Sequence, residues 1–166
     1  MEENKIVIED SIETKKDFIC RKGIEDALRG ELDKADILIL PKKDFREGVP
    51  FCVPECTREI FQFLKTELAK TDNSIDLAIS DDEYTEIELH DVCVYLPDLY
   101  MNVILLPLAI NLLSSWIYDK FSGNPATKEE PKVKITIIVA TPKGNKRIKF
   151  EGDNKSFKQL MDKVKL

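Results

Sequence analysis

The chain has 166 residues, of which 43% are hydrophobic and 34% charged, and its formal net charge is −6. This length and composition are typical of a globular protein and not of a disordered one, so we expect a single α/β domain over 1–166, with 1–96 and 97–166 as its sub-units. The acidic balance argues against a nucleic-acid-binding protein, which would usually present a basic face.

The first half of the chain predicts strands that alternate with helices. The expected order is strand 5–8 (short and buried), helix 14–32 (weakened by Gly23), strand 35–40 (ADILIL, ended by Pro41), polar loop 42–54, helix 55–70 and strand 74–79. Such an order favours parallel strands joined by right-handed crossovers. We therefore expect a short, mostly parallel sheet with crossover helices. Residues 86–96 then form either one bent strand or two short ones.

Leu99 to Tyr118 contains no charged residue. A run of roughly 20 apolar residues is long enough to span a bilayer. Polar residues such as Asn111 and the weak bias of flanking charge favour instead a hydrophobic helix at the centre of the core, kinked or started afresh at Pro107. Two alternatives stay open, namely a membrane helix and a helix that buries its second face against another protein.

The C-terminal third predicts a β-hairpin followed by a helix. After a linker or mobile loop over 122–131, apolar residues alternate from Val133 to Val139, which is typical of a half-buried strand. A turn at 142–145 leads into a return strand over 146–150. A helix from about Lys155 to Lys165 follows, capped by Asp153 or Asn154.

The cysteines predict free thiols in a reducing compartment. Cys52 and Cys56 have a spacing compatible with zinc, but no second close pair follows and the only histidine, His90, lies far away. One alternative is catalytic: Cys52 or Cys56, at the start of a helix, would be a nucleophile and His90 its base. The favoured interpretation is that these cysteines are small buried residues that pack a loop against the sheet. No signal peptide precedes the first strand, so we expect a cytoplasmic protein without a cofactor or metal.

Two groups of charged residues are candidate sites. Loops that follow parallel strands often bind ligands, and here they hold Lys42, Lys43 and Arg46, then Asp81, Asp82 and Glu83. They would supply cations for a phosphate and carboxylates for a metal, although no glycine-rich phosphate loop accompanies them, and exposed polar loops are the favoured interpretation. The hairpin carries Lys143, Lys146, Arg147 and Lys149, either a docking surface for an acidic partner or a solvated face.

The segments ILILP, FREGVPF, EIFQFLK and LPLAINLLSSWIYDKF, in this order, resemble small bacterial proteins from defence or conflict gene neighbourhoods. The last third, an apolar helix followed by KVKITIIVATPKGNKRIKFEG and a short helix, is similar to the effector-associated constant component proteins. The resemblance implies an accessory or adaptor part and transfers no catalytic residue. We expect a non-catalytic interaction component that binds a protein partner or a second copy of itself. The alternative is a small nucleotide- or metal-dependent enzyme that uses the loops after the second and third strands.

Overall fold

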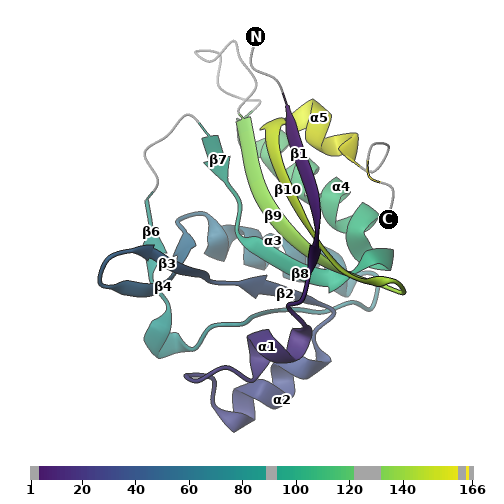
Figure 1. The fold of residues 1–166 in the computed structure, drawn as a ribbon. Coiled ribbons are helices and arrows are strands. Elements are labelled where there is room, and N and C mark those ends of the chain that lie inside the picture. The colour runs from purple at the N-terminus through teal and green to yellow at the C-terminus, as the bar shows by residue number, and fades with distance from the viewer. Residues whose placement is uncertain (1–3, 89–92, 122–131, 161–163, 165–166) are drawn as a thin grey trace.

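The computed structural model of the chain describes residues 4–88, 93–121, 132–160 and 164, and it shows a mixed α/β fold (Figure 1). The elements in chain order are β1 (Lys5–Ser11), α1 (Lys15–Ile19), α2 (Asp26–Lys34), β2 (Ile37–Leu40), β3 (Lys42–Arg46), β4 (Val49–Pro54), α3 (Thr57–Ala69), β5 (Ile75–Leu77), η1 (Asp81–Glu83), β6 (Glu86–Ile87), β7 (Cys93–Tyr95), β8 (Asp98–Asn102), η2 (Val103–Leu105), α4 (Leu106–Phe121), β9 (Lys132–Thr141), β10 (Gly144–Asp153) and α5 (Asn154–Lys158). The predicted linker over 122–131 lies outside the described residues.

The main sheet is mixed rather than mostly parallel. Its strands run in the order β1-β10-β9-β8-β2-β5, and β7 pairs with β9 beside β8. The pairs β2–β5, β8–β9 and β7–β9 are parallel, whereas β1–β10, β10–β9 and β2–β8 are antiparallel. The expected mostly parallel sheet is wrong because β1 does not join β2. It crosses to the far end of the sheet and pairs with β10, which the order of elements along the chain does not encode.

One face of this sheet carries the larger core. The alternating residues Val133, Ile135, Ile137 and Val139 of β9 point to this face and are at most 2% exposed, which confirms the predicted half-buried strand. Helices α3, α4 and α5 cover it, and Figure 1 shows them behind the sheet. The predicted cap of the last helix is also present, because the Asp153 carboxylate accepts a 2.7 Å hydrogen bond from the backbone N–H of Ser156.

The uncharged run is a strand followed by a core helix. Leu99 to Asn102 belong to β8, and α4 begins only at Leu106, so the helix expected over the whole run is too long by several residues. Pro107 lies in the first turn of α4, where its missing N–H costs no hydrogen bond. Val103–Phe121 is, among the described residues, the one helical segment long and apolar enough to cross a membrane, a test that buried core helices also pass. Here seven α4 residues are buried, including Ile110 and Leu113, and they pack against the sheet.

The opposite face of the sheet, called here the outer face, carries α1 and α2. The helix predicted over 14–32 is divided into these two by Gly23, whose φ of 103° is left-handed and favours glycine. Phe18 of α1 and Leu32 of α2 pack there with Leu38 and Ile138 in a second, smaller core cluster. The pair of helices leaves part of the outer face beside β10 open.

Two further expectations for the first half differ from the structure. The predicted loop over 42–54 is a hairpin, because β3 pairs with β4 around a turn that places Gly48 at φ 81°. β4 also pairs with β6 in a three-stranded sheet of order β3-β4-β6, and the described part of 86–96 holds two short strands, β6 and β7, which is one of the two predicted alternatives. The strand predicted to be buried at 5–8 lies at the sheet edge, where Val7 is 47% exposed.

Candidate functional site

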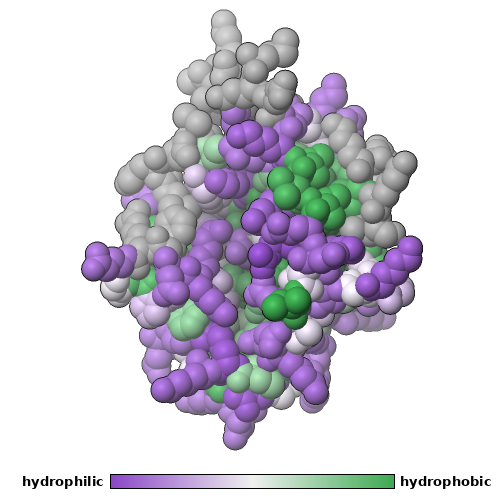
Figure 2. Space-filling model, in the orientation of Figure 1, coloured by the Kyte–Doolittle hydropathy of each residue, from purple (hydrophilic) through white to green (hydrophobic). Residues whose placement is uncertain are grey.

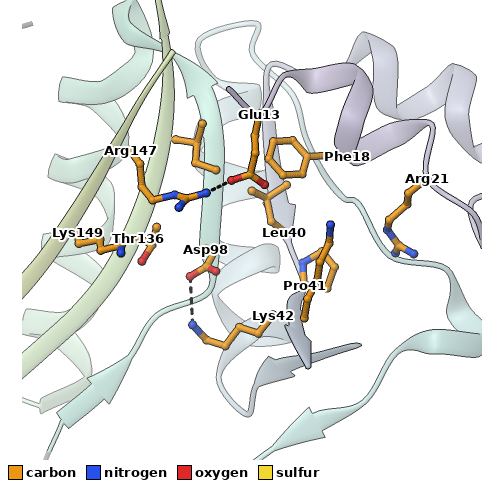
Figure 3. Close-up of a pocket in the computed structure, with 12 residues that line it drawn as sticks. Glu13, Phe18, Arg21, Leu40, Pro41, Lys42, Asp98, Thr136, Arg147 and Lys149 are labelled. Carbon is orange, nitrogen blue, oxygen red and sulfur yellow. Dashed lines mark hydrogen bonds and ion pairs between the residues drawn. The ribbon is translucent and has the colours of Figure 1, made fainter. Parts of the chain in front are cut away.

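A cavity of about 330 Å³ opens on the outer face of the main sheet, between α1 and β10 (Figure 3). Twelve described residues line it: Glu13, Phe18, Arg21, Leu40, Pro41, Lys42, Lys43, Asp98, Thr136, Ile138, Arg147 and Lys149. They come from both ends of the sequence, so only the folded chain brings them together. The volume falls within the range of small-ligand sites, roughly 300–1,000 Å³.

The floor and one wall of the cavity follow from strand alternation. Because Ile135 and Ile137 point into the larger core, their neighbours Thr136 and Ile138 point to the outer face. On β10 the same alternation turns Arg147 and Lys149 outward, in register with Ile138 and Thr136. The pattern of the hairpin therefore fixes which two of its cations reach the cavity.

The opposite wall begins where β2 ends. Leu40 and Pro41 lead directly into Lys42 and Lys43, the first residues of β3. The Nζ of Lys42 donates a 3.2 Å hydrogen bond to the Asp98 carboxylate, and both side chains are about one-fifth exposed. Burial raises the pKa of Asp98 above its ordinary value, although the Lys42 ammonium acts in the opposite direction. The ion pair thus holds the Lys42 ammonium in place at the edge of the cavity.

Arg21 occupies the far end of the cavity and connects two loops. Its guanidinium donates 3.0 Å hydrogen bonds to both carboxylate oxygens of Glu83 and a 3.1 Å bond to the carbonyl of Ala78. It also lies 4.1 Å from the ring centroid of Phe51. These hydrogen bonds hold the pKa of Glu83 below its ordinary value, chiefly through Arg21. Arg21 therefore fastens the loop after α1 to η1 and to the β3–β4 hairpin.

A third set of ion pairs lies along β10. Arg147 pairs with Glu13, and Figure 3 shows the two side chains meeting across the mouth of the cavity. The carboxylate of Glu9, on β1, lies 3.4 Å from Lys149 and 3.8 Å from Arg147. Lys43, in contrast, is exposed and forms no ion pair with any carboxylate of the described residues.

Most of the charged side chains that line the cavity are cationic. Five cationic side chains and two carboxylates line it, in a chain whose net charge is −6. Among the described lining residues there is no serine, cysteine or histidine, and Thr136 supplies the one aliphatic hydroxyl. Such a lining can bind a carboxylate or phosphate through charge-assisted hydrogen bonds.

The structure divides each predicted group of site residues. Lys42 and Lys43 line the cavity, while Arg46 ends β3 and its side chain lies outside the described atoms. Asp81 and Asp82 are exposed in η1 away from the cavity lining, and Glu83 is held by Arg21. These placements leave the predicted ligand role a prediction.

The basic hairpin is divided in the same way. Arg147 and Lys149 line the cavity, but Lys146 points to the opposite face of the sheet and pairs with Asp10. Lys143 is exposed in the turn between β9 and β10. The four cations therefore do not form one continuous surface.

Cys56 is poorly suited to act as the predicted nucleophile. Cys56 precedes α3, donates a 3.2 Å hydrogen bond to the carbonyl of Tyr95, and has its pKa raised by burial to about 11. A thiol with that pKa is protonated at neutral pH, which argues against a nucleophile. The proposed base His90 lies outside the described residues. No three His, Cys, Asp or Glu side chains of the described residues are placed to hold a metal.

Four polar lining residues were not predicted from the sequence: Glu13, Arg21, Asp98 and Thr136. Each lies in a segment that the pattern describes only as a helix, loop or strand, and no spacing connects them. Of these four, only Asp98 has a sequence context that could have identified it. It directly precedes the uncharged run that starts at Leu99, and a carboxylate beside such a run must either pair with a cation or remain exposed to water.

The chain matches no protein-family model, no curated protein and no solved structure. The resemblance to the effector-associated constant component proteins therefore stays a prediction.

Proposed function

We propose that the protein is a non-catalytic binding component, an adaptor, whose cavity holds an acidic segment of a partner protein. The observation that carries the proposal is the cavity itself, which is lined by five cations and two carboxylates. A carboxylate side chain of a partner would contact Lys43 first, because this lysine is exposed and not neutralised by an ion pair of the described chain.

The remaining cations are held in place by the chain's own carboxylates. Lys42 is fixed by Asp98, and Arg147 is fixed by Glu13. Such pairs orient the donors before a ligand arrives but also compete with it, so binding should be modest in affinity and sensitive to salt. These are properties of a reversible adaptor. A role in a prokaryotic defence system would be a further step that rests on the resemblance alone.

The proposal is tested with a fluorescently labelled polyglutamate peptide, whose anisotropy is measured against the full chain at low and at high salt. A polyglutamine peptide of the same length is the ligand control. Lys43→Glu should weaken polyglutamate binding about tenfold, since a cation of the cavity becomes a repelling anion. Lys65→Glu changes the same charge on an exposed position of α3, behind the sheet, and should leave binding nearly unchanged.

Two results would refute the proposal. The first is equal binding of polyglutamate and polyglutamine by the wild-type chain. The second is an equal loss of affinity in Lys43→Glu and Lys65→Glu, because net charge and not the cavity would then account for binding.

A second candidate, a small nucleotide-dependent enzyme, is favoured by one observation. The parallel strands β2 and β5 are neighbours, with Ile39 in register with Leu77, so the loops that follow them start side by side. Arg21 spans the gap from Glu83 in one loop to the cavity beside the other. A thermal-shift series with ATP, GTP and inorganic phosphate tests it, because a specific ligand raises the melting temperature. A rise with nucleotide, absent with phosphate and polyglutamate, would favour this candidate over the adaptor.

A further inference from the structure

β1 forms an edge of the main sheet, and no residue of β1 lines the cavity. β1 stands at the end of the strand order, and among the described strands it pairs along one side only, with β10. Val7 and Ile8 within it are 47% and 38% exposed. Figure 2 shows an apolar patch on the surface where Figure 1 places β1. Unpaired N–H and C=O groups beside bare apolar side chains form a template for another strand.

We propose that β1 pairs in antiparallel orientation with β1 of a second copy of the chain, about a twofold axis through Val7. The two main sheets then form one continuous sheet across the pair. This inference goes beyond the adaptor function, because it uses a different surface and requires no acidic ligand.

The order of residues along β1 carries the proposal. With the axis at Val7, the two Val7 side chains are opposite each other, Ile6 is opposite the second copy's Ile8, and Lys5 is opposite the second copy's Glu9. Directly opposed residues in antiparallel strands share a face, and their side chains interact. Lys5, Val7 and Glu9 point to the outer face, whereas Ile6 and Ile8 point to the face of the larger core, in register with Phe150 and Ile148. Every one of these pairs is therefore apolar with apolar or cation with anion.

Neighbouring registers lack this complementarity. With the axis at Ile8, Val7 would face Glu9 and Ile6 would face Asp10. With the axis at Ile6, Lys5 would face Val7. An axis between two residues would place opposed side chains on different faces of the sheet, which the pleat forbids. The register at Val7 is thus the one in which both charges and both apolar pairs match.

Charge reversal tests the register directly. Lys5→Glu alone creates two Glu–Glu contacts in the pair, and Glu9→Lys alone creates two Lys–Lys contacts. When the two variants are mixed, each variant chain meets the other, and both contacts become Glu–Lys again. Because the substitutions within each chain are unchanged by mixing, any loss of internal contacts, such as that of Glu9 with Lys149 at 3.4 Å, does not influence the comparison.

The measurement is sedimentation velocity across a concentration series, with circular dichroism to show that each variant is folded. We expect the wild-type chain to form dimers, each variant alone to dimerise at least about tenfold more weakly, and the mixture to recover dimers. Lys65→Glu mixed with Glu31→Lys, two exposed positions on α3 and α2, serves as the matched control and should behave as wild type throughout. A wild-type chain that stays monomeric at about 100 μM would overturn the proposal, since specific dimers form well below this concentration. A mixture that is no more dimeric than its components would overturn the register at Val7.

Discussion

Replacement of Arg21 by alanine is the sharpest test of what holds the end of the cavity together. The guanidinium makes both 3.0 Å hydrogen bonds to Glu83, one to the carbonyl of Ala78, and the contact with the Phe51 ring. Arg21→Ala removes all of these and leaves the Glu83 carboxylate without its principal partner. The loop after α1 then loses its connection to η1.

The expected loss follows from burial. Removing one partner of a fully buried ion pair costs about 3–5 kcal/mol, because the remaining charge is left unpaired. The side chains of Arg21 and Glu83 are 10% and 21% exposed, so water can rehydrate the carboxylate in part. We therefore expect Arg21→Ala to lower the free energy of unfolding by about 2 kcal/mol at neutral pH, measured by urea titration. Arg21→Lys keeps the positive charge but cannot form the bidentate hydrogen bonds to Glu83. Its free energy of unfolding should therefore lie between those of the wild type and Arg21→Ala.

The dependence on pH separates the ion pair from loss of packing. Arg21 holds the pKa of Glu83 below its ordinary value of 4.5 in the folded state. A group with a lowered folded pKa contributes stability above its unfolded pKa, and that contribution is lost as the pH falls through the folded pKa. The difference between wild type and Arg21→Ala should thus be greatest above pH 4.5 and shrink in acid. A difference that is absent at neutral pH, or that stays constant into acid, would refute the reasoning.

Three further predictions concern burial. Because burial raises the pKa of Cys56 to about 11, iodoacetamide at pH 8 should alkylate Cys56 in the folded protein about 100-fold more slowly than an ordinary thiol, while exposed Cys20 reacts readily; mass spectrometry of the tryptic peptides decides this. Phe157→Ala should cost about 3–5 kcal/mol in a urea titration, because Phe157 is fully buried with its ring centroid 5.4 Å from that of Phe150. Burial also raises the pKa of Asp98 in the folded state, so ionisation of this carboxylate opposes folding. Its contribution should lower the free energy of unfolding as the pH rises above 3.8, the ordinary pKa of the group. Asp98→Asn should remove that part of the pH dependence, and an unchanged stability–pH profile in this variant would contradict it.

Elements with a strong local pattern could be predicted from the sequence. The strand predicted over ADILIL is present as β2 (Ile37–Leu40), whose residues are apolar and buried on both faces, and α3 occupies Thr57–Ala69 inside the predicted 55–70. The alternation of Val133 to Val139 and the turn after it likewise predicted the C-terminal hairpin. In each case the information lies within a few consecutive residues, where side-chain periodicity and backbone geometry are directly connected.

Features that depend on distant contacts could not be predicted in the same way. The uncharged run contains both β8 and α4, and hydrophobicity alone does not show where a strand ends and a helix starts. β3 is mostly charged and its pairing with β4 is irregular, so the hairpin resembles a loop in the sequence. The candidate site is the extreme case, because Glu13 meets Arg147 only after β1 has paired with β10. The sequence could identify cations near the cavity but not the carboxylates that would orient them.

The pairing of β1 with β10 also has a consequence for biosynthesis. Ile6 and Ile8 find their partners, Phe150 and Ile148, more than a hundred residues later in the chain. β1 is thus translated before the other strands of this sheet but is among the last to be placed, because β9, to which β8, β7 and β10 all attach, is translated much later than β1. Such a high contact order slows folding and leaves an apolar strand exposed on the nascent chain. Release of this protein from the ribosome before its final hairpin is complete would yield a fragment prone to aggregation.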